Sequence, residues 1–217
     1  MHPIATRLSA AARKRRAGRL LDLIAEIVAA RGRCRIIDLG GEVRYWQAFD
    51  QAKLRLPGVS ILCVNLQAQV SEDPFIDVLQ GDACRLPQFE DGAFDLAHSN
   101  SVIEHVGEWS NMEAFAGELR RLAPFYYVQT PYFWFPIEPH FLAPIFHWLP
   151  EPMRIRAMLR RGHGHHPRET TVAGAVAAVR SARLLDKTAF RSLFPDADHE
   201  DERVLGLVKS LIAVRGG

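Results

Sequence analysis

The sequence predicts an α/β fold, with a doubly wound, mostly parallel sheet, an antiparallel last strand and helices on both faces. Short apolar runs that end in glycine or polar residues recur between residues 34 and 131. Helical patterns separate most of these runs, as in parallel sheets built by crossover connections. Two further runs, at 203–207 and 210–214, lie too close together for a helical crossover and must pair antiparallel.

The size and composition of the chain indicate a single globular domain. Its 217 residues are 48% hydrophobic and 24% charged, which argues against a wholly disordered, collagen-like or membrane-spanning chain. The three cysteines form no CxxC pair, so neither a disulfide framework nor a zinc knuckle is predicted. No uncharged apolar run approaches the roughly 18 residues of a membrane span, and no leader pattern follows the basic run at 13–16. We therefore expect a cytoplasmic protein.

Positive charge is concentrated at the start of the sequence. The formal net charge is +2, but residues 1–35 carry nine Lys or Arg against two Asp or Glu. Leu20, Ile24 and Ile27 recur at helical spacing, so an amphipathic basic helix is predicted over 7–31. The overall field is too weak for non-specific nucleic-acid binding. A solvated helix face is the simpler reading of the basic head, and contact with a phosphate-bearing or membrane surface stays open.

The remaining elements follow in order. Strands are predicted at 36–39, 60–66, 77–82, 94–100 and 125–130, and helices at 45–56, 110–122 and 186–194. Ser110 and Glu113 have the spacing of a capping box, and Pro124 and Pro195 end the last two helices. The single domain 1–217 thus divides into a basic helix (1–33), a core (34–131), an insert (132–183) and a final helix with a hairpin (184–217).

The insert 132–183 is expected to form a lid that carries specificity for a substrate. It is rich in proline and aromatic residues and holds five of the nine histidines. Its aromatic residues either line an apolar pocket or form a small core of the insert: Phe133, Trp134, Phe135, Phe146 and Trp148. The glycines and arginines around His163, His165 and His166 predict a solvated loop there rather than a metal site.

Chemistry is expected where the strands end, because open α/β sheets bind ligands at the carboxyl ends of their strands. The polar and small residues at these ends are Asp38, Gly40, Gly41, Asn65, Asp82, Ala83, Ser99 and Asn100. A dinucleotide site would require further glycines after Gly41 so that the backbone approaches a pyrophosphate. Glu42 and Arg44 stand there instead, so a nicotinamide-dependent reductase is disfavoured.

Five motifs in this order resemble the class I S-adenosylmethionine-dependent methyltransferases of the type 11 group. They are Ile36-Ile37-Asp38-Leu39-Gly40-Gly41, Gly81-Asp82-Ala83 with Leu86-Pro87, Asp91-Gly92-Ala93-Phe94-Asp95-Leu96, Ser101-Val102-Ile103-Glu104-His105-Val106 and Thr130-Pro131. The resemblance covers residues 34–131. It implies a seven-stranded sheet of order 3-2-1-4-5-7-6 and S-adenosylmethionine as cofactor.

The resemblance also implies a cofactor-binding set. Gly40 would let the backbone approach the amino-acid part of the cofactor, and Asp38 would anchor the turn or the cofactor ammonium. Asn65 stands where the family has an acid that grips the ribose hydroxyls, so a charged hydrogen bond is lost there. Asp82 would accept from the adenine amino group and Ala83 would offer its backbone N–H. Gly41, Ser99 and Asn100 complete the predicted set.

Glu104, His105, Glu138 and His140 are the predicted catalytic residues. Methyl transfer from a sulfonium is an in-line displacement, so the protein mainly aligns the acceptor, and a hydroxyl acceptor also needs a base. His105 has the pKa range for that task. We expect transfer to an oxygen of a small-molecule or glycan-like acceptor.

Other interpretations of these residues stay open. Glu104 and His105 are equally explained as local structural residues, and the four groups as a hydrogen-bond network. They could also hold a divalent cation, as in the small-RNA 2′-O-methyltransferases, although Ser101 replaces one glutamate of that pattern; the sequence itself assigns no metal site. A degenerate cofactor-binding scaffold is the remaining alternative.

Overall fold

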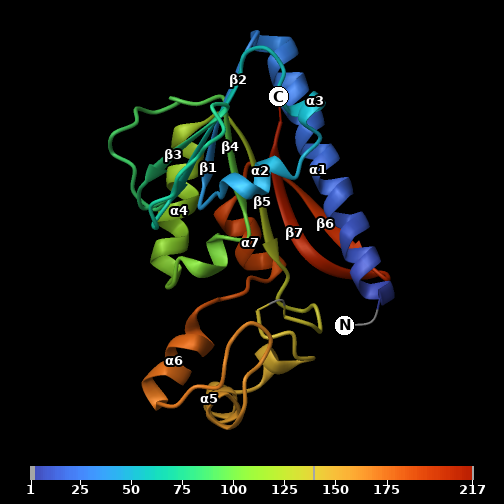
Figure 1. Cartoon of the computed structure of the whole chain (residues 1–217), viewed down its shortest axis with the longest axis vertical. Coiled ribbons are helices and arrows are strands. Elements are labelled where there is room, and N and C mark those ends of the chain that lie inside the picture. Colours follow the sequence, from blue (N-terminus) through green and yellow to red (C-terminus); the bar gives the residue numbers. More distant parts are fainter. Residues whose placement is uncertain (1–2, 139, 217) are drawn as a thin grey trace.

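The computed structural model describes residues 3–138 and 140–216, which form a seven-stranded sheet flanked by helices (Figure 1). The strand order is β3-β2-β1-β4-β5-β7-β6. The strands β1 to β5 run parallel, and β7 pairs antiparallel with both β5 and β6. The bounds are β1 Cys34–Leu39, β2 Val59–Asn65, β3 Ile76–Gln80, β4 Leu96–Asn100, β5 Phe125–Pro131, β6 Asp198–Val204 and β7 Leu207–Arg215. The predicted fold class and strand order are confirmed.

The central strands are apolar because helices bury both of their faces. Ile36 and Ile37 are both fully buried, yet they belong to different hydrophobic clusters on opposite faces of the sheet. This follows from the alternation of side chains along a strand. A near-continuous apolar run is therefore the signature of a strand in the middle of this sheet.

The helices divide between the two faces. Helices α1 (Pro3–Arg31), α2 (Val43–Gln47) and α3 (Gln51–Leu54) contribute to one cluster, whereas α4 (Trp109–Leu122) and α7 (Lys187–Leu193) contribute to the other (Figure 1). The single helix predicted over 45–56 is two short helices. Asp50 interrupts it, because its side chain caps α3 by accepting a hydrogen bond from the Ala52 N–H at 3.1 Å.

Two details of the predicted elements are wrong. Helix α4 begins at Trp109 after Glu108, and no side-chain hydrogen bond caps it, so Ser110 lies inside the helix and forms no capping box. The hairpin turns at Leu205 and Gly206, which have φ of 52° and 80°. A two-residue turn needs such positive φ values, so the strand predicted over 203–207 is interrupted and β6 ends at Val204.

Strand β6 spans Asp198–Val204, whereas the sequence predicts a strand over 203–207. The difference arises because β6 is charged rather than apolar. It lies at the sheet edge and contacts α1. Arg16 and Arg19 of α1 form ion pairs with Glu202 at 3.5 Å and Glu200 at 3.2 Å. Part of the basic head therefore faces an acidic strand of the same chain.

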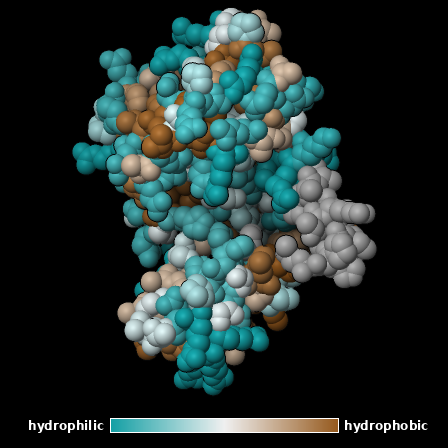
Figure 2. Space-filling model, in the orientation of Figure 1, coloured by the Kyte–Doolittle hydropathy of each residue, from teal (hydrophilic) through white to brown (hydrophobic). Residues whose placement is uncertain are grey.

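The insert forms a lobe with its own core beyond the carboxyl end of β5 (Figures 1 and 2). It contains η2 (Phe146–Trp148), α5 (Glu151–Arg160) and α6 (Val172–Arg180). Its buried residues are Phe141, Phe146, Met158, Ala175, Ala178 and Val179. Of the five aromatic residues considered above, only Phe146 belongs to this buried set within the described chain, and Trp134 and Trp148 are exposed.

The expected solvated histidine loop is partly packed. His163 is buried and its ring lies 4.7 Å from that of Phe146, while His166 stacks on Phe141 at 4.8 Å. His165 remains exposed. Two of the three histidines therefore pack on Phe141 and Phe146 in the core of the insert.

No helix within residues 3–138 and 140–216 is long and apolar enough to cross a membrane.

Replacing Asp186 tests its role as the N-cap of helix α7. The Asp186 side chain accepts from the Ala189 N–H at 2.8 Å. Asp186→Ala should lower the free energy of unfolding by about 1 kcal/mol, because it leaves this N–H without its cap. Urea denaturation measures the difference. Asp186→Asn keeps a side-chain acceptor at the cap, and Ser110→Ala removes no capping hydrogen bond. Both variants should therefore have nearly the wild-type free energy of unfolding. Equal losses in all three variants would contradict the assignment.

Candidate active site

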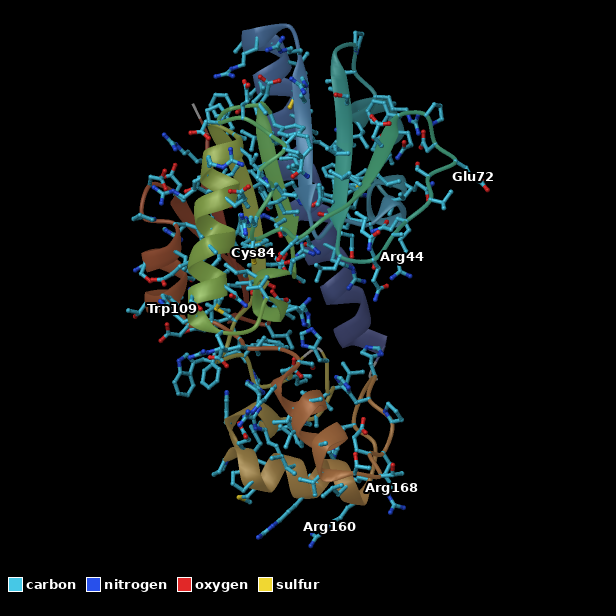
Figure 3. The ribbon with its side chains drawn as sticks, turned by 90° about the vertical axis from the view of Figure 1, so that its left-hand side faces the viewer. Arg44, Glu72, Cys84, Trp109, Arg160 and Arg168 are labelled. Atoms are coloured by element: carbon cyan, nitrogen blue, oxygen red, sulfur yellow. The ribbon has the colours of Figure 1, made fainter. Side chains whose placement is uncertain are left out.

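A cavity of about 380 Å³ opens where the parallel strands β1, β2 and β4 end. This volume lies in the usual range for small-ligand sites. The lining residues come from five separate segments of the chain: Gly40, Val64, Asn65, Leu66, Gly81, Asp82, Ala83, Cys84, Ser101, Val102, His105, Val106 and Asn111. Cys84 marks its position beside α4 in Figure 3. Gly40, Asn65, Asp82, Ala83 and His105 of the predicted site residues thus meet in one cavity.

The turn after β1 requires both of its glycines. Gly40 has φ of +77°, and a Cβ there would collide with the side chain of Val102. At Gly41 a Cβ would collide with the carboxylate of Asp38. The turn therefore brings bare backbone to the cavity edge, which fits a site in which a ligand lies close to the main chain.

Asp38 is directed into the protein from the end of β1. It is 1% exposed, and its Oδ2 accepts a hydrogen bond from Trp46 Nε1 at 2.7 Å. Its Oδ1 lies 2.7 Å from Nδ1 of His98, which donates to it. The other ring nitrogen of His98 lies 3.2 Å from the Tyr45 hydroxyl. Both carboxylate oxygens thus have internal partners, which favours the turn-anchoring role over contact with a cofactor ammonium.

Asn65 and Asp82 organise the opposite wall of the cavity. The Asn65 amide donates to the carbonyl oxygens of Gly40 and Gly41, each at 3.3 Å. The Asp82 carboxylate accepts from the Cys84 N–H at 2.9 Å, and Asp82 remains exposed. An acid at position 65 could not donate to the turn carbonyls, so the asparagine suits this glycine turn.

Ser99 and Asn100 lie on β4 and are not among the residues that line the cavity. The Ser99 hydroxyl donates to the Leu39 carbonyl at 2.9 Å and is buried. Asn100 Oδ1 is buried and has no hydrogen-bond partner among the described residues. Ser99 thus contacts the residue directly before the glycine turn.

The four predicted catalytic residues form one polar cluster next to the cavity. Glu104, in η1 (Ile103–His105), is fully buried, and its Oε2 accepts from the Thr130 hydroxyl at 2.9 Å. The rings of His105 and His140 meet edge to face at 4.6 Å. His140 Nδ1 makes a short contact with Glu138 Oε1, whose second oxygen accepts from the Phe141 N–H at 2.8 Å.

Burial and local charges shift the titration of this cluster. Burial raises the pKa of Glu104 to about 7. Desolvation also lowers the pKa of His105 below its ordinary value. Burial would lower the pKa of His140, but the hydrogen bond and charge of Glu138 raise it overall. Burial correspondingly opposes ionisation of Glu138, yet His140 holds the pKa of that carboxyl below its usual range.

A second cavity, of about 490 Å³, lies on the insert side of the cluster. Glu138 lines it together with Phe133, Phe141, His147 and Arg154, among others. Because His105 lines the first cavity and Glu138 the second, the polar cluster lies between the two. Arg160 and Arg168 lie at the far end of the insert, away from this junction (Figure 3).

Several residues of the site were not predicted from the sequence. Thr130 was quoted only as part of a motif, and its hydroxyl partner Glu104 is 26 positions away. The backbone carbonyl of Ser181 accepts a hydrogen bond from His105 Nδ1 at 2.7 Å. A pattern of side chains cannot predict this contact, because the acceptor belongs to the backbone. Val102 had no predicted role, yet its side chain makes Gly40 indispensable.

Comparison with known families identifies the central segment of the chain. A family model described as a methyltransferase domain matches residues 38–123, the segment that carries the glycine turn, Asn65, Asp82 and the Glu104-His105 pair. Residues 38–123 thus form a methyltransferase domain. No match was found among curated proteins.

Solved structures share the fold of this methyltransferase at low identity. Magnesium protoporphyrin IX methyltransferase from Synechocystis, with bound S-adenosylmethionine, has a TM-score of 0.52 and 10% identity, covering 100% of this chain and 86% of that chain. A possible exported protein from Bordetella parapertussis has a TM-score of 0.53 and 13% identity, covering 94% and 68%. Identities this low carry the fold alone.

Removing the Asp38 carboxylate tests its anchoring role in the methyltransferase. Asp38→Ala should lower the free energy of unfolding of the ligand-free protein by about 2–4 kcal/mol, because two buried donors lose their acceptor. Asp38→Asn should fall between this variant and wild type, since one amide oxygen can accept from only one of the two. Urea denaturation without ligand is the measurement, and wild-type stability in Asp38→Ala would refute the anchoring role.

Proposed function

We propose that this methyltransferase moves a methyl group from S-adenosylmethionine to an oxygen of a small-molecule or glycan-like acceptor. The observation that carries the proposal is the junction of the strand-end cavity with the buried polar cluster. One cavity has the bare glycine turn that would let the amino-acid part of the cofactor approach the backbone, and the other lies across the cluster from it.

The residues around the first cavity suit the cofactor. The backbone at Gly40 and Gly41 would approach its amino-acid part, Asn65 would face the ribose hydroxyls, and Asp82 with the Ala83 N–H would hold the adenine. We assign Ser99 to support of the turn, through its bond to the Leu39 carbonyl, and keep Asn100 in the predicted cofactor-binding set. When bound, S-adenosylmethionine supplies an electrophilic methyl group on a sulfonium centre.

The polar cluster is the part of the chain that acts on the acceptor. An acceptor hydroxyl is a weak nucleophile until its proton is lost or its oxygen is polarised. Glu104, His105, Glu138 and His140 are the ionisable groups between the two cavities, and insert residues such as Phe133 and Arg154 would contact the acceptor body. Because a hydroxyl acceptor needs such a base, these groups support oxygen as the accepting atom.

Calorimetric titration of the purified protein with S-adenosylmethionine tests cofactor binding, with NAD as the contrasting ligand. Transfer of a labelled methyl group to a small-molecule and oligosaccharide fraction then tests the acceptor class. Binding without transfer to any acceptor would favour the scaffold alternative. Labelling of RNA in place of the small acceptors would overturn the acceptor class proposed here.

Asp82→Ala should weaken cofactor binding by about 1.5–3 kcal/mol, because a hydrogen bond to a charged acceptor is lost. This corresponds to a dissociation constant about 10- to 150-fold higher. Asp77→Ala, on the neighbouring strand β3 and outside the lining residues, is the matched control. An unchanged affinity in a folded Asp82→Ala protein would exclude the adenine-binding role.

His105→Ala should lower the turnover number by about 10²- to 10⁴-fold and change the cofactor affinity by less than about threefold. The expected split follows from the position of His105 at the junction of the cavities, where it acts on the acceptor. Release of S-adenosylhomocysteine with a methylated acceptor fraction measures turnover, and calorimetry measures affinity. His165→Ala, an exposed histidine of the insert, is the control. Wild-type turnover in His105→Ala would remove it from the mechanism.

A further inference from the structure

Three side chains of the polar cluster offer ligand atoms to a common point. One carboxylate oxygen of Glu104 and one ring nitrogen each of His105 and His140 lie within 4.8 Å of one another. These residues come from η1 and from the insert, so the fold brings them together across 36 positions of sequence. Two imidazoles and one carboxylate are a donor set that divalent transition metals favour.

The free atoms of these side chains match that purpose. The Ser181 carbonyl can only accept, so its 2.7 Å contact requires Nδ1 of His105 to carry the proton. The contact of His140 Nδ1 with the Glu138 carboxylate has the same consequence. In each neutral ring Nε2 then keeps its lone pair, and neither Nε2 has a hydrogen-bond partner within residues 3–138 and 140–216.

Glu104 supplies the second, independent observation. Its side chain is 0% exposed, and its Oε1 has no hydrogen-bond partner among the described residues. A buried carboxylate oxygen without a partner is costly. The Thr130 hydroxyl holds the other oxygen, Oε2, so Oε1 remains available to a ligand.

The groups behind the three side chains resemble the outer shell of a metal centre in their chemistry. Metal-binding histidines usually donate their second ring N–H to a carboxylate or a backbone carbonyl, and ligating carboxylates are hydrogen-bonded in turn. Here Glu138 accepts from His140, the Ser181 carbonyl accepts from His105, and the Thr130 hydroxyl donates to Glu104. A plain hydrogen-bond network would require a proton on one of these three atoms, because two neutral rings with free Nε2 and a carboxylate offer acceptors only.

We propose that Glu104, His105 and His140 bind one divalent transition-metal ion, with Glu138 orienting His140 from behind. Three protein ligands leave further coordination positions open, as in catalytic rather than structural sites. Ligands of a tetrahedral ion lie about 3.4 Å apart at normal bond lengths, so binding draws the three atoms slightly inward. The inference rests on the proposed function, in which the ion would hold the acceptor oxygen between the two cavities.

Metal binding is tested on the untagged full-length protein after dialysis against a chelator. Co²⁺ is titrated in and followed by its visible absorption, and Zn²⁺ by calorimetry. Wild type should bind one equivalent of each. Glu104→Gln and His140→Ala should each lose at least 100-fold in affinity, and Glu138→Gln about 10- to 100-fold, the range found for second-shell partners.

Matched controls separate this site from other histidines and from misfolding. His165→Ala should bind both ions like wild type, and circular dichroism of every variant should match the wild-type spectrum. Should the conservative Glu104→Gln variant prove unfolded, Glu138→Gln and His140→Ala carry the comparison. The inference is overturned if folded wild type binds neither ion at 100 µM, or if both of these variants bind as tightly as wild type. Loss of binding in His165→Ala would equally overturn it.

Titration of the same metal-free protein with S-adenosylmethionine distinguishes this inference from the proposed function. Cofactor binding without metal binding overturns the metal site alone. Metal binding without cofactor binding overturns the proposed function and leaves the metal site in place.

Discussion

The candidate active site depends on the tight turn that follows β1. At that point the backbone turns with two glycines, one confined by Val102 and the other by the carboxylate of Asp38. Asp38 is in turn held between Trp46 and His98 beneath the turn. A Cβ at either glycine would collide with a neighbour, so the backbone stays bare at the edge of the cavity where five chain segments meet. The buried polar bonds under the turn keep the backbone in this unusual course.

Much of the core and part of the site were predictable from residue types in order along the chain. Buried strands read as apolar runs, and the residues that follow them meet because parallel strands end at one edge. This reasoning predicts that Gly40, Asn65 and Asp82 lie at one edge of the sheet, and all three line one cavity there. It also grouped Glu104, His105, Glu138 and His140, since they follow neighbouring strands β4 and β5.

The remaining features depended on contacts that composition does not encode. Strand β6 was misplaced because its charged side chains find their partners on α1, and periodicity alone cannot reveal a helix lying 181 residues earlier. The capping box predicted for α4 is wrong because Ser110 has the required spacing to Glu113 but does not stand at the N-cap position. Which oxygen of Glu104 is left over, and which nitrogen of each histidine is already engaged, depends on Thr130, Ser181 and Glu138. Such choices become visible only in three dimensions.

The pairing of α1 with β6 also concerns how the molecule is made. Arg19 leaves the ribosome 181 residues ahead of Glu200, its partner at 3.2 Å. The apolar face of α1 packs on the sheet through Leu20 and Ile24, but its charged face has no acidic strand to meet until the hairpin emerges. Contacts between segments so distant are slow to form and favour partly folded states during synthesis. The nascent protein therefore carries an unmatched cationic helix through most of translation, and its neutralisation coincides with closure of the sheet.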